Sequence, residues 1–483
     1  MRKLLSIFKR AVRPFRLSKK GPSVSAKTPR AAQVEPAQVE TKIVCIDPRL
    51  NAPLENLPPE VRRQILFTLD FEGLRALTHA SPVYHQQFIL DQKPLLRRCL
   101  ENTLRSVAVE AYFAQQSSSA SFSKERTKDG VAQFLQSYQD RRSSPHSVLQ
   151  EVSSDEASKM IAFHTSIVEP LVAEFTRWAL DNLDKFAGTQ QEHQPLSTAE
   201  ETRVLRAFYR YELCCHLFGL GAHLREEPDH LNFESVEILT LFAVPFEPWE
   251  VEEVACVCRF LQNKYEQIFD EISWDVNENN PKFDGERPPT PDGAFDLTGV
   301  CLSFFPSPRC VQIANQPIDP RCSFLTAVLS RGLPLLHTVL FRIRNHDHLV
   351  TTMQEQIAWP LGSFFDDDTG NALSDTPQYY RRREYPSERD AMQDRRDPLL
   401  FQGDCAALAG PDGIWTSLPP LAWTVLWRET YSNIFGFHVP EEIQRWGYVL
   451  WDAKRMEETG AKEALTRWIE NKWGDYDPRN SIY

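Results

Sequence analysis

The stretch LENLPPEVRRQILFTLDFEGLRALTHASPVYHQQF, residues 54–88, has the clearest helical patterning in the chain. Its adjacent prolines at 58 and 59 suit the first turn of a helix, where a missing N–H costs no hydrogen bond. From Val61 onward, apolar side chains recur at offsets of four, five and eight residues. This spacing predicts an amphipathic helix with one apolar stripe.

Two further short helices are predicted after the first. Asp70-Phe-Glu-Gly separates it from a second helix, in which Leu74 and Leu77 lie one turn apart. Ser81-Pro82 combines a side-chain cap with proline at the first helical position, so it predicts the start of a third helix. Helices this short bury their apolar faces poorly, and each exposed Leu or Ile would forgo roughly 1.5–3 kcal/mol. The segment is therefore expected to dock on something.

The pattern L-P-x-E-[IV]-x-x-x-I-L-x-x-L-x-x-x-x-L-x-x-L, which residues 57–77 follow, resembles an F-box. The longer HASPVYHQQFILDQKPLLRRCLE, residues 79–101, is similar to the extended form in uncharacterised fungal F-box proteins. WGYVLWDAKRM, residues 446–456, is similar to theirs too. Many F-boxes end with a basic residue before Trp, where this chain has the run from Tyr84 to Phe88.

The resemblance implies a three-helix module that binds the linker protein of a cullin-RING (SCF) ubiquitin ligase. The rest of the chain would hold a protein substrate of unknown identity. Such an adaptor acts by proximity, so we expect no catalysis of its own and no cofactor. Some of the motif residues would face the module's core instead of the partner, and the sequence does not sort the two groups. The expected linker-protein contacts are Leu57, Pro58, Val61, Ile65, Leu66, Leu69, Leu74 and Leu77.

Two other functions stay open. The three helices could pack within the chain, which would make the protein a scaffold outside any ligase. A metal-dependent hydrolase is the third hypothesis, because His346-Asp-His348 and the acidic run starting at Asp366 could supply ligands. A lone H-x-H is common, however, and neither G-x-S-x-G nor a Cys–His signature occurs. We therefore expect the protein not to be an enzyme.

Charge is distributed unevenly along the chain. Residues 1–30 contain ten Lys or Arg and no acid, which leaves 44 basic against 66 acidic side chains in the remainder. So acidic a body is a poor partner for nucleic acid, whose binding depends on basic side chains. The basic leader is interpreted as a solvated tail or nuclear-import patch, with a mitochondrial presequence as the minority reading. We expect a cytoplasmic or nuclear protein without a transmembrane segment.

The cysteines and tryptophans are both expected to be mostly core residues. The ten cysteines are scattered, contain no CxxC, and are read as reduced, buried thiols, including Cys256 and Cys258. Seven of the 11 tryptophans lie in the last 69 residues. They could line a peptide-binding groove, but the helical spacing of Trp423 and Trp427 favours a core position.

The predicted architecture is all-α: a three-helix F-box-like module followed by a larger, irregular helical domain with long loops. A capping box at Ser197-Thr-Ala-Glu200, a helix over 251–274 and another from Pro440 to Gly460 support this. Long loops are predicted at 277–295 and 364–413. The expected divisions are a basic leader and linker at 1–50, the F-box-like module at 51–105, a linker with a possible short helix at 106–155, and a substrate-binding helical domain at 156–483.

Overall fold

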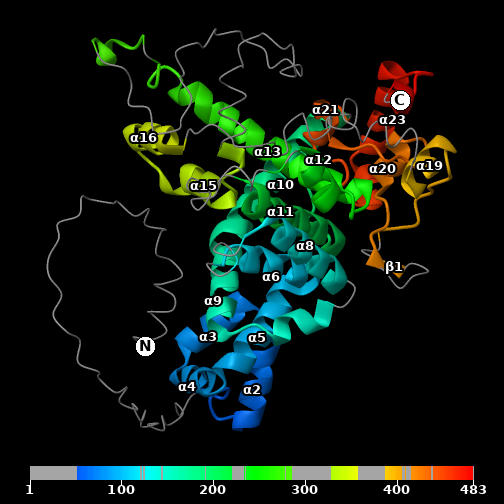
Figure 1. The fold of residues 1–483 in the computed structure, drawn as a ribbon. Coiled ribbons are helices and arrows are strands. Elements are labelled where there is room, and N and C mark those ends of the chain that lie inside the picture. Colours follow the sequence, from blue (N-terminus) through cyan, green and yellow to red (C-terminus); the bar gives the residue numbers. More distant parts are fainter. Residues whose placement is uncertain are drawn as a thin grey trace. The chain divides into compact units, whose positions relative to one another are not determined.

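A computed structural model describes residues 52–119, 122, 126–142, 145–190, 192–219, 233, 235–277, 279–285, 328–356, 387–404, 408–409, 415–436 and 439–481. Within these ranges the regular secondary structure is helical, apart from one antiparallel pair of two-residue strands, β1 (Leu408–Ala409) and β2 (Trp415–Thr416), and turns and loops connect the helices (Figure 1). The predicted all-α fold is confirmed. The chain forms two compact units, one from residues 1–105 and 149–163, the other from residues 106–148 and 164–483.

The first unit contains the three helices predicted from residues 54–88. Asp70 accepts a hydrogen bond from the backbone N–H of Gly73, and the Ser81 side chain accepts one from Tyr84, so both helix starts are capped. Helix α5 packs on α2, α3 and α4, and also on α9, which lies far along the chain. The helices of this unit are α2 (Pro59–Thr68), α3 (Phe71–Ala80), α4 (Pro82–Leu90), α5 (Gln92–Leu104) and α9 (Ser154–Phe163).

Where the structure describes residues 106–155, which were predicted as a linker with a possible short helix, they are mostly helical. They contain α6 (Ala108–Ser117) and α8 (Lys128–Arg142), which belong to the second unit, and the start of α9. Helix α6 packs on α11, and the Phe113 ring lies 5.1 Å from that of Tyr138 on α8. The possible short helix of that prediction corresponds to α8, and α6 is a further helix before the polar run that follows Ala114.

Three long helices form the centre of the second unit: α10 (Glu169–Ala187), α11 (Thr198–Phe218) and α13 (Pro248–Ile272). The capping box predicted at Ser197 and Glu200 is present at the start of α11. A second capping box, Glu247 with Glu250, starts α13, and Pro248 occupies its first turn. Helix α10 ends at Gly188, whose φ of 73° is the left-handed conformation that favours glycine.

The helix predicted from Pro440 to Gly460 is interrupted. Helix α21 stops at Gln444, a turn follows, and a new helix begins at Ala453. Gly447 has a φ of 67°, and a Cβ there would lie 3.1 Å from the Leu450 side chain, so the turn requires glycine. The apolar spacing across the break imitates a helix because both halves face the same core.

Shorter elements complete the second unit. Of the two predicted long loops, 277–295 contains η7, and 364–413 contains α19 and β1; the rest of each lies mostly outside the described residues. The remaining α-helices are α12 (Ser235–Ile238), α15 (Leu333–His337), α16 (His346–Gln356), α19 (Glu388–Asp394), α20 (Leu421–Leu426), α21 (Glu441–Gln444), α22 (Ala453–Glu458) and α23 (Ala461–Lys472). The 3-10 helices are η1 (Arg105–Val107), η2 (Pro145–Gln150), η7 (Pro281–Phe283) and η11 (Pro478–Ser481), and the π-helical turns are η3 (His164–Val168), η6 (Leu239–Ala243) and η9 (Thr338–Arg342).

Four tryptophans of the C-terminal region are core, as the spacing of Trp423 and Trp427 suggested, whereas Trp468 and Trp473 are half-buried. Trp423, Trp427, Trp446 and Trp451 are each at most 1% exposed. The five cysteines within the described ranges, among them Cys256 and Cys258, are buried free thiols; the other five lie outside those ranges. No helix among the described residues has the length and apolar character needed to cross a membrane.

Candidate interaction face

The eight predicted contact residues of the first unit differ in burial: some lie in its core and others at its surface. Leu66 is fully buried and Leu74 is 3% exposed, so both belong to the unit's own core. Val61 is 42% exposed, and Pro58 is exposed as well. The other four are half-buried: Leu57, Ile65, Leu69 and Leu77.

Four of these residues share one flank formed by α2 and its two cap residues, Pro58 and Leu69. Val61, Ile65 and Leu69 follow Pro58 at offsets of three, seven and eleven residues, which places them along one side of a helix. Leu66 lies on the adjacent side, toward the core. We call Pro58, Val61, Ile65 and Leu69 the α2 flank. It is an apolar surface on a helix whose other side is already packed.

Backbone-directed side chains fix the position of α2. The Asn102 side-chain amide on α5 donates to the backbone carbonyls of Phe67 and Leu69, at 2.8 and 2.9 Å. These carbonyls lie at the end of α2, where no later N–H of the same helix can bind them. The next residue, Thr103, accepts a hydrogen bond from the first N–H of α3 at 3.1 Å. One turn of α5 therefore fixes the corner between α2 and α3.

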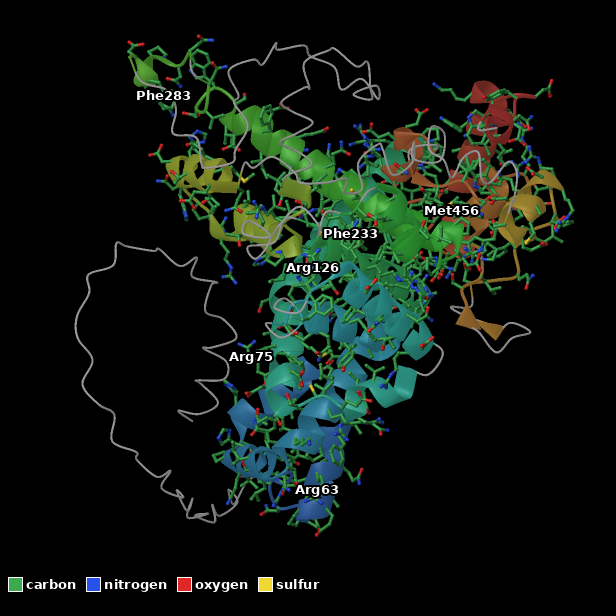
Figure 2. All side chains as sticks on the ribbon, in the orientation of Figure 1. Arg63, Arg75, Arg126, Phe233, Phe283 and Met456 are labelled. Carbon is green, nitrogen blue, oxygen red and sulfur yellow. The ribbon has the colours of Figure 1, made fainter. Side chains whose placement is uncertain are left out.

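Polar contacts attach α2 and the residues before it to α4. Arg63, labelled in Figure 2, donates two hydrogen bonds to the Asp91 carboxylate, at 2.8 and 2.9 Å. The buried Glu55 accepts a bond from the Ser81 hydroxyl at 2.6 Å, and Tyr84 donates to the Leu54 carbonyl at 3.1 Å. These bonds hold the chain ahead of α2 in place, so the α2 flank is presented by a rigid support.

Further apolar exposure lies at both ends of this motif. Leu54 is 56% exposed, and Ile89 and Leu90, at the end of α4, are 45% and 55% exposed. Single exposed apolar residues are common on soluble proteins, but large exposed apolar surfaces mark interaction sites. Sequence reasoning missed Ile89 and Leu90, although both fall within the stretch of residues 79–101 that resembles extended F-boxes.

The second unit holds a buried charge network. Arg210 on α11 is fully buried and contacts Glu250 of α13 at 3.0 Å and Glu110 of α6 at 3.4 Å. Arg142 of α8 reaches the same Glu250 oxygen at 2.8 Å. Burial alone would raise the pKa of Glu250, but Arg142, Arg210 and Arg206 together lower it below its usual range. Such paired groups join four helices, and no reaction needs to be invoked for them.

A hydrogen-bonded series of serine, histidine and glutamate side chains lies between α6 and α11. Ser117 lies 2.9 Å from His216 Nδ1, and His216 Nε2 lies 3.0 Å from Glu212. The order imitates a hydrolase triad. Ser117, however, is only 1% exposed, and its hydroxyl also donates to the Ala114 carbonyl at 2.9 Å. These three side chains therefore serve to connect α6 and α11.

The two histidines suggested as metal ligands, His346 and His348, both lie on α16. His346 contacts Asp275 at 2.8 Å and Glu271 at 3.2 Å, and these bonds raise its pKa. His348 is exposed on the same helix, and Asp366 lies outside the described residues. Among the residues described, no group of three His, Cys, Asp or Glu could hold a metal ion.

Comparison of the chain with protein-family models, with curated proteins and with solved structures gives no match in any of the three.

Proposed function

We propose that the first unit is an F-box-type module, through which the chain links a target protein to a cullin-RING ubiquitin ligase. The single observation that carries the proposal is the α2 flank, an apolar surface on a rigidly supported helix. Its residues Pro58, Val61, Ile65 and Leu69 all fall on the F-box pattern. An apolar helix face of this kind suits recognition in a partner's groove.

The division of the motif into core and surface also supports the proposal. Leu66 and Leu74 fill the interior, which keeps the helices folded without a partner, while Val61 stays available. The second unit would then hold the substrate, and proximity to the conjugating enzyme would drive modification without a catalytic residue in this chain.

A scaffold outside any ligase is the second candidate, and one observation favours it. Helix α9, from beyond residue 150, packs on α5 within the first unit. Part of the surface of α5, on which α2, α3 and α4 pack, is thus already covered by the chain itself. On this alternative the α2 flank binds some other protein or none.

Copurification from fungal cells distinguishes the two. A tagged full-length chain is compared with Val61→Asp, which adds a charge to the α2 flank near the start of the helix, where the dipole tolerates an acid. The matched control is Leu400→Asp, because Leu400 is 56% exposed and lies in the second unit.

The adaptor proposal expects the linker protein and cullin to copurify with the wild type and with Leu400→Asp, and to be lost from Val61→Asp. Hydrogen exchange of α2, α3 and α4 establishes that the variant is folded. If neither protein accompanies the wild type, the scaffold alternative replaces the adaptor. If Val61→Asp retains both, the α2 flank is not the contact surface.

A further inference from the structure

Glu252 on α13 differs from three other buried carboxylates of the second unit, Glu200, Glu250 and Glu253. Its side chain is 0% exposed, and within the described ranges no Lys, Arg or His forms an ion pair with it. By contrast, its neighbours Glu250 and Glu253 are paired with arginines, and Glu200 is paired with Arg455. A buried carboxylate without a cation is costly when ionised, because water no longer solvates it.

The hydrogen-bond partners of Glu252 all come from one C-terminal segment. The backbone N–H of Gly436 and the amide of Gln444 both donate to it, the latter at 3.2 and 3.4 Å from the two oxygens. The Tyr448 hydroxyl donates at 3.2 Å. Gln444 also donates to the Gly436 carbonyl at 2.9 Å, so the three residues form one connected set around the carboxylate. Glu252 is the point where α13 holds this segment.

These contacts suit the two protonation states differently. The ionised carboxylate can accept from all three donors. A protonated carboxyl must itself donate, and of the three atoms that face it, the Gly436 N–H, the Gln444 amide nitrogen and the Tyr448 hydroxyl, only the hydroxyl is able to accept. The donors therefore favour the charged form, while burial favours the neutral form, and burial is the larger effect because it raises the pKa of Glu252 to about 7.

We propose that Glu252 is a proton-controlled lock, which holds the segment carrying Gly436, Gln444 and Tyr448 on α13 when neutral and loosens it when ionised. Opening the segment exposes the carboxylate to water, which stabilises its charged form. Ionisation and opening are therefore coupled, and rising pH favours opening. The lock would tie the packing of the tryptophan-rich C-terminal region to pH near neutrality.

The charged and titratable groups that the structure describes around the lock do not duplicate it. On α13, Cys256 is buried and burial raises its pKa well above the usual range, and Arg259 contacts Gln444 at 3.4 Å and Glu441 at 3.7 Å. From the C-terminal segment, burial raises the pKa of Tyr448. Neither Cys256 nor Tyr448 changes charge between pH 5 and 8, and arginine stays protonated throughout.

The experiment follows backbone hydrogen exchange of residues 436 and 444–450 in the full chain from pH 5 to 8, corrected for the intrinsic pH dependence of exchange. In the wild type, the opening constant should rise by up to about tenfold per pH unit below pH 7 and level off above it. Glu252→Gln, which is isosteric and does not titrate, should show an opening constant independent of pH.

Two controls isolate the group. Glu442→Gln removes a carboxylate from α21 that is 52% exposed and should leave the pH dependence unchanged. His438→Gln tests the histidine two residues after Gly436 in the sequence, because histidine is the residue type whose unperturbed pKa lies in this range, and the variant should also behave as the wild type. If His438→Gln abolishes the pH dependence, or Glu252→Gln retains it, the assignment to Glu252 is overturned.

Tyr448→Phe provides a test that does not depend on Glu252→Gln folding. It removes a donor to the ionised carboxylate, so the midpoint of the opening curve should move to higher pH. A merely structural role for Tyr448 would instead increase opening equally at every pH. A wild-type opening constant that is flat from pH 5 to 8 would also refute the proposal.

Discussion

Leu66→Ala and Val61→Ala should have very different consequences although the two residues are five positions apart on α2. Leu66 is fully buried, so truncation leaves a cavity and should cost the first unit about 2–5 kcal/mol. Val61 is 42% exposed. Each buried methyl-sized group is worth about 0.8 kcal/mol, and valine loses two that are only partly buried, so the cost should be about 1 kcal/mol at most.

Hydrogen exchange of the α2, α3 and α4 amides measures both effects in the full chain, because it reports the local opening free energy. Leu66→Ala should accelerate exchange by at least about thirtyfold, and Val61→Ala by less than about tenfold. Every tryptophan of the chain lies in the second unit, so tryptophan fluorescence checks that this unit is unaffected. Equal acceleration by the two substitutions would refute the division of the motif into core and surface.

Two further predictions concern charges in the second unit. Arg210→Met should destabilise this unit by about 3–5 kcal/mol, because Glu110 loses its ion pair and stays buried; guanidinium unfolding followed by tryptophan fluorescence measures the loss. Adding Glu110→Gln should recover part of the lost stability. If it recovers none, the unpaired Glu110 carboxylate is not the cause of the loss. His346→Ala should increase hydrogen exchange at the start of α16 at pH 5.5 but scarcely at pH 8. Asp275 and Glu271 raise the pKa of His346, so the stability that the charged imidazole gives to α16 is lost as pH rises through that raised pKa. An equal increase at both pH values would contradict an ionic role for His346.

Local signals in the sequence predicted the helix starts well. Ser81-Pro82 and the Ser197–Glu200 capping box act within four residues, so no distant contact is needed to interpret them. The break near Gly447 was missed because it depends on a close approach between the backbone and Leu450. Apolar periodicity does not reveal such a contact.

The candidate site was only partly predictable for a related reason. The spacing of Val61, Ile65, Leu66 and Leu69 defines an apolar stripe, but which edge of the stripe faces the core depends on where α5 packs. Asn102 and Thr103, which determine that packing, are 33 and 32 residues away from the backbone groups they bind. Glu252 gave no signal either, since its partners lie more than 180 residues later.

Two glutamates on one turn of α13 have opposite effects on stability across the pH range. The arginines around Glu250 lower its pKa in the folded state. Its contribution to the free energy of unfolding is therefore present above its unfolded-state pKa and is lost as pH falls through its folded-state pKa. The pKa of Glu252 is raised to about 7, so its contribution is present in acid and is lost as pH rises through 7. The pH ranges in which Glu250 and Glu252 both contribute to stability overlap only in mildly acidic solution. On these two groups, the second unit should therefore be most stable there, and Glu252→Gln should remove the decline toward neutral pH while leaving the acid limb unchanged.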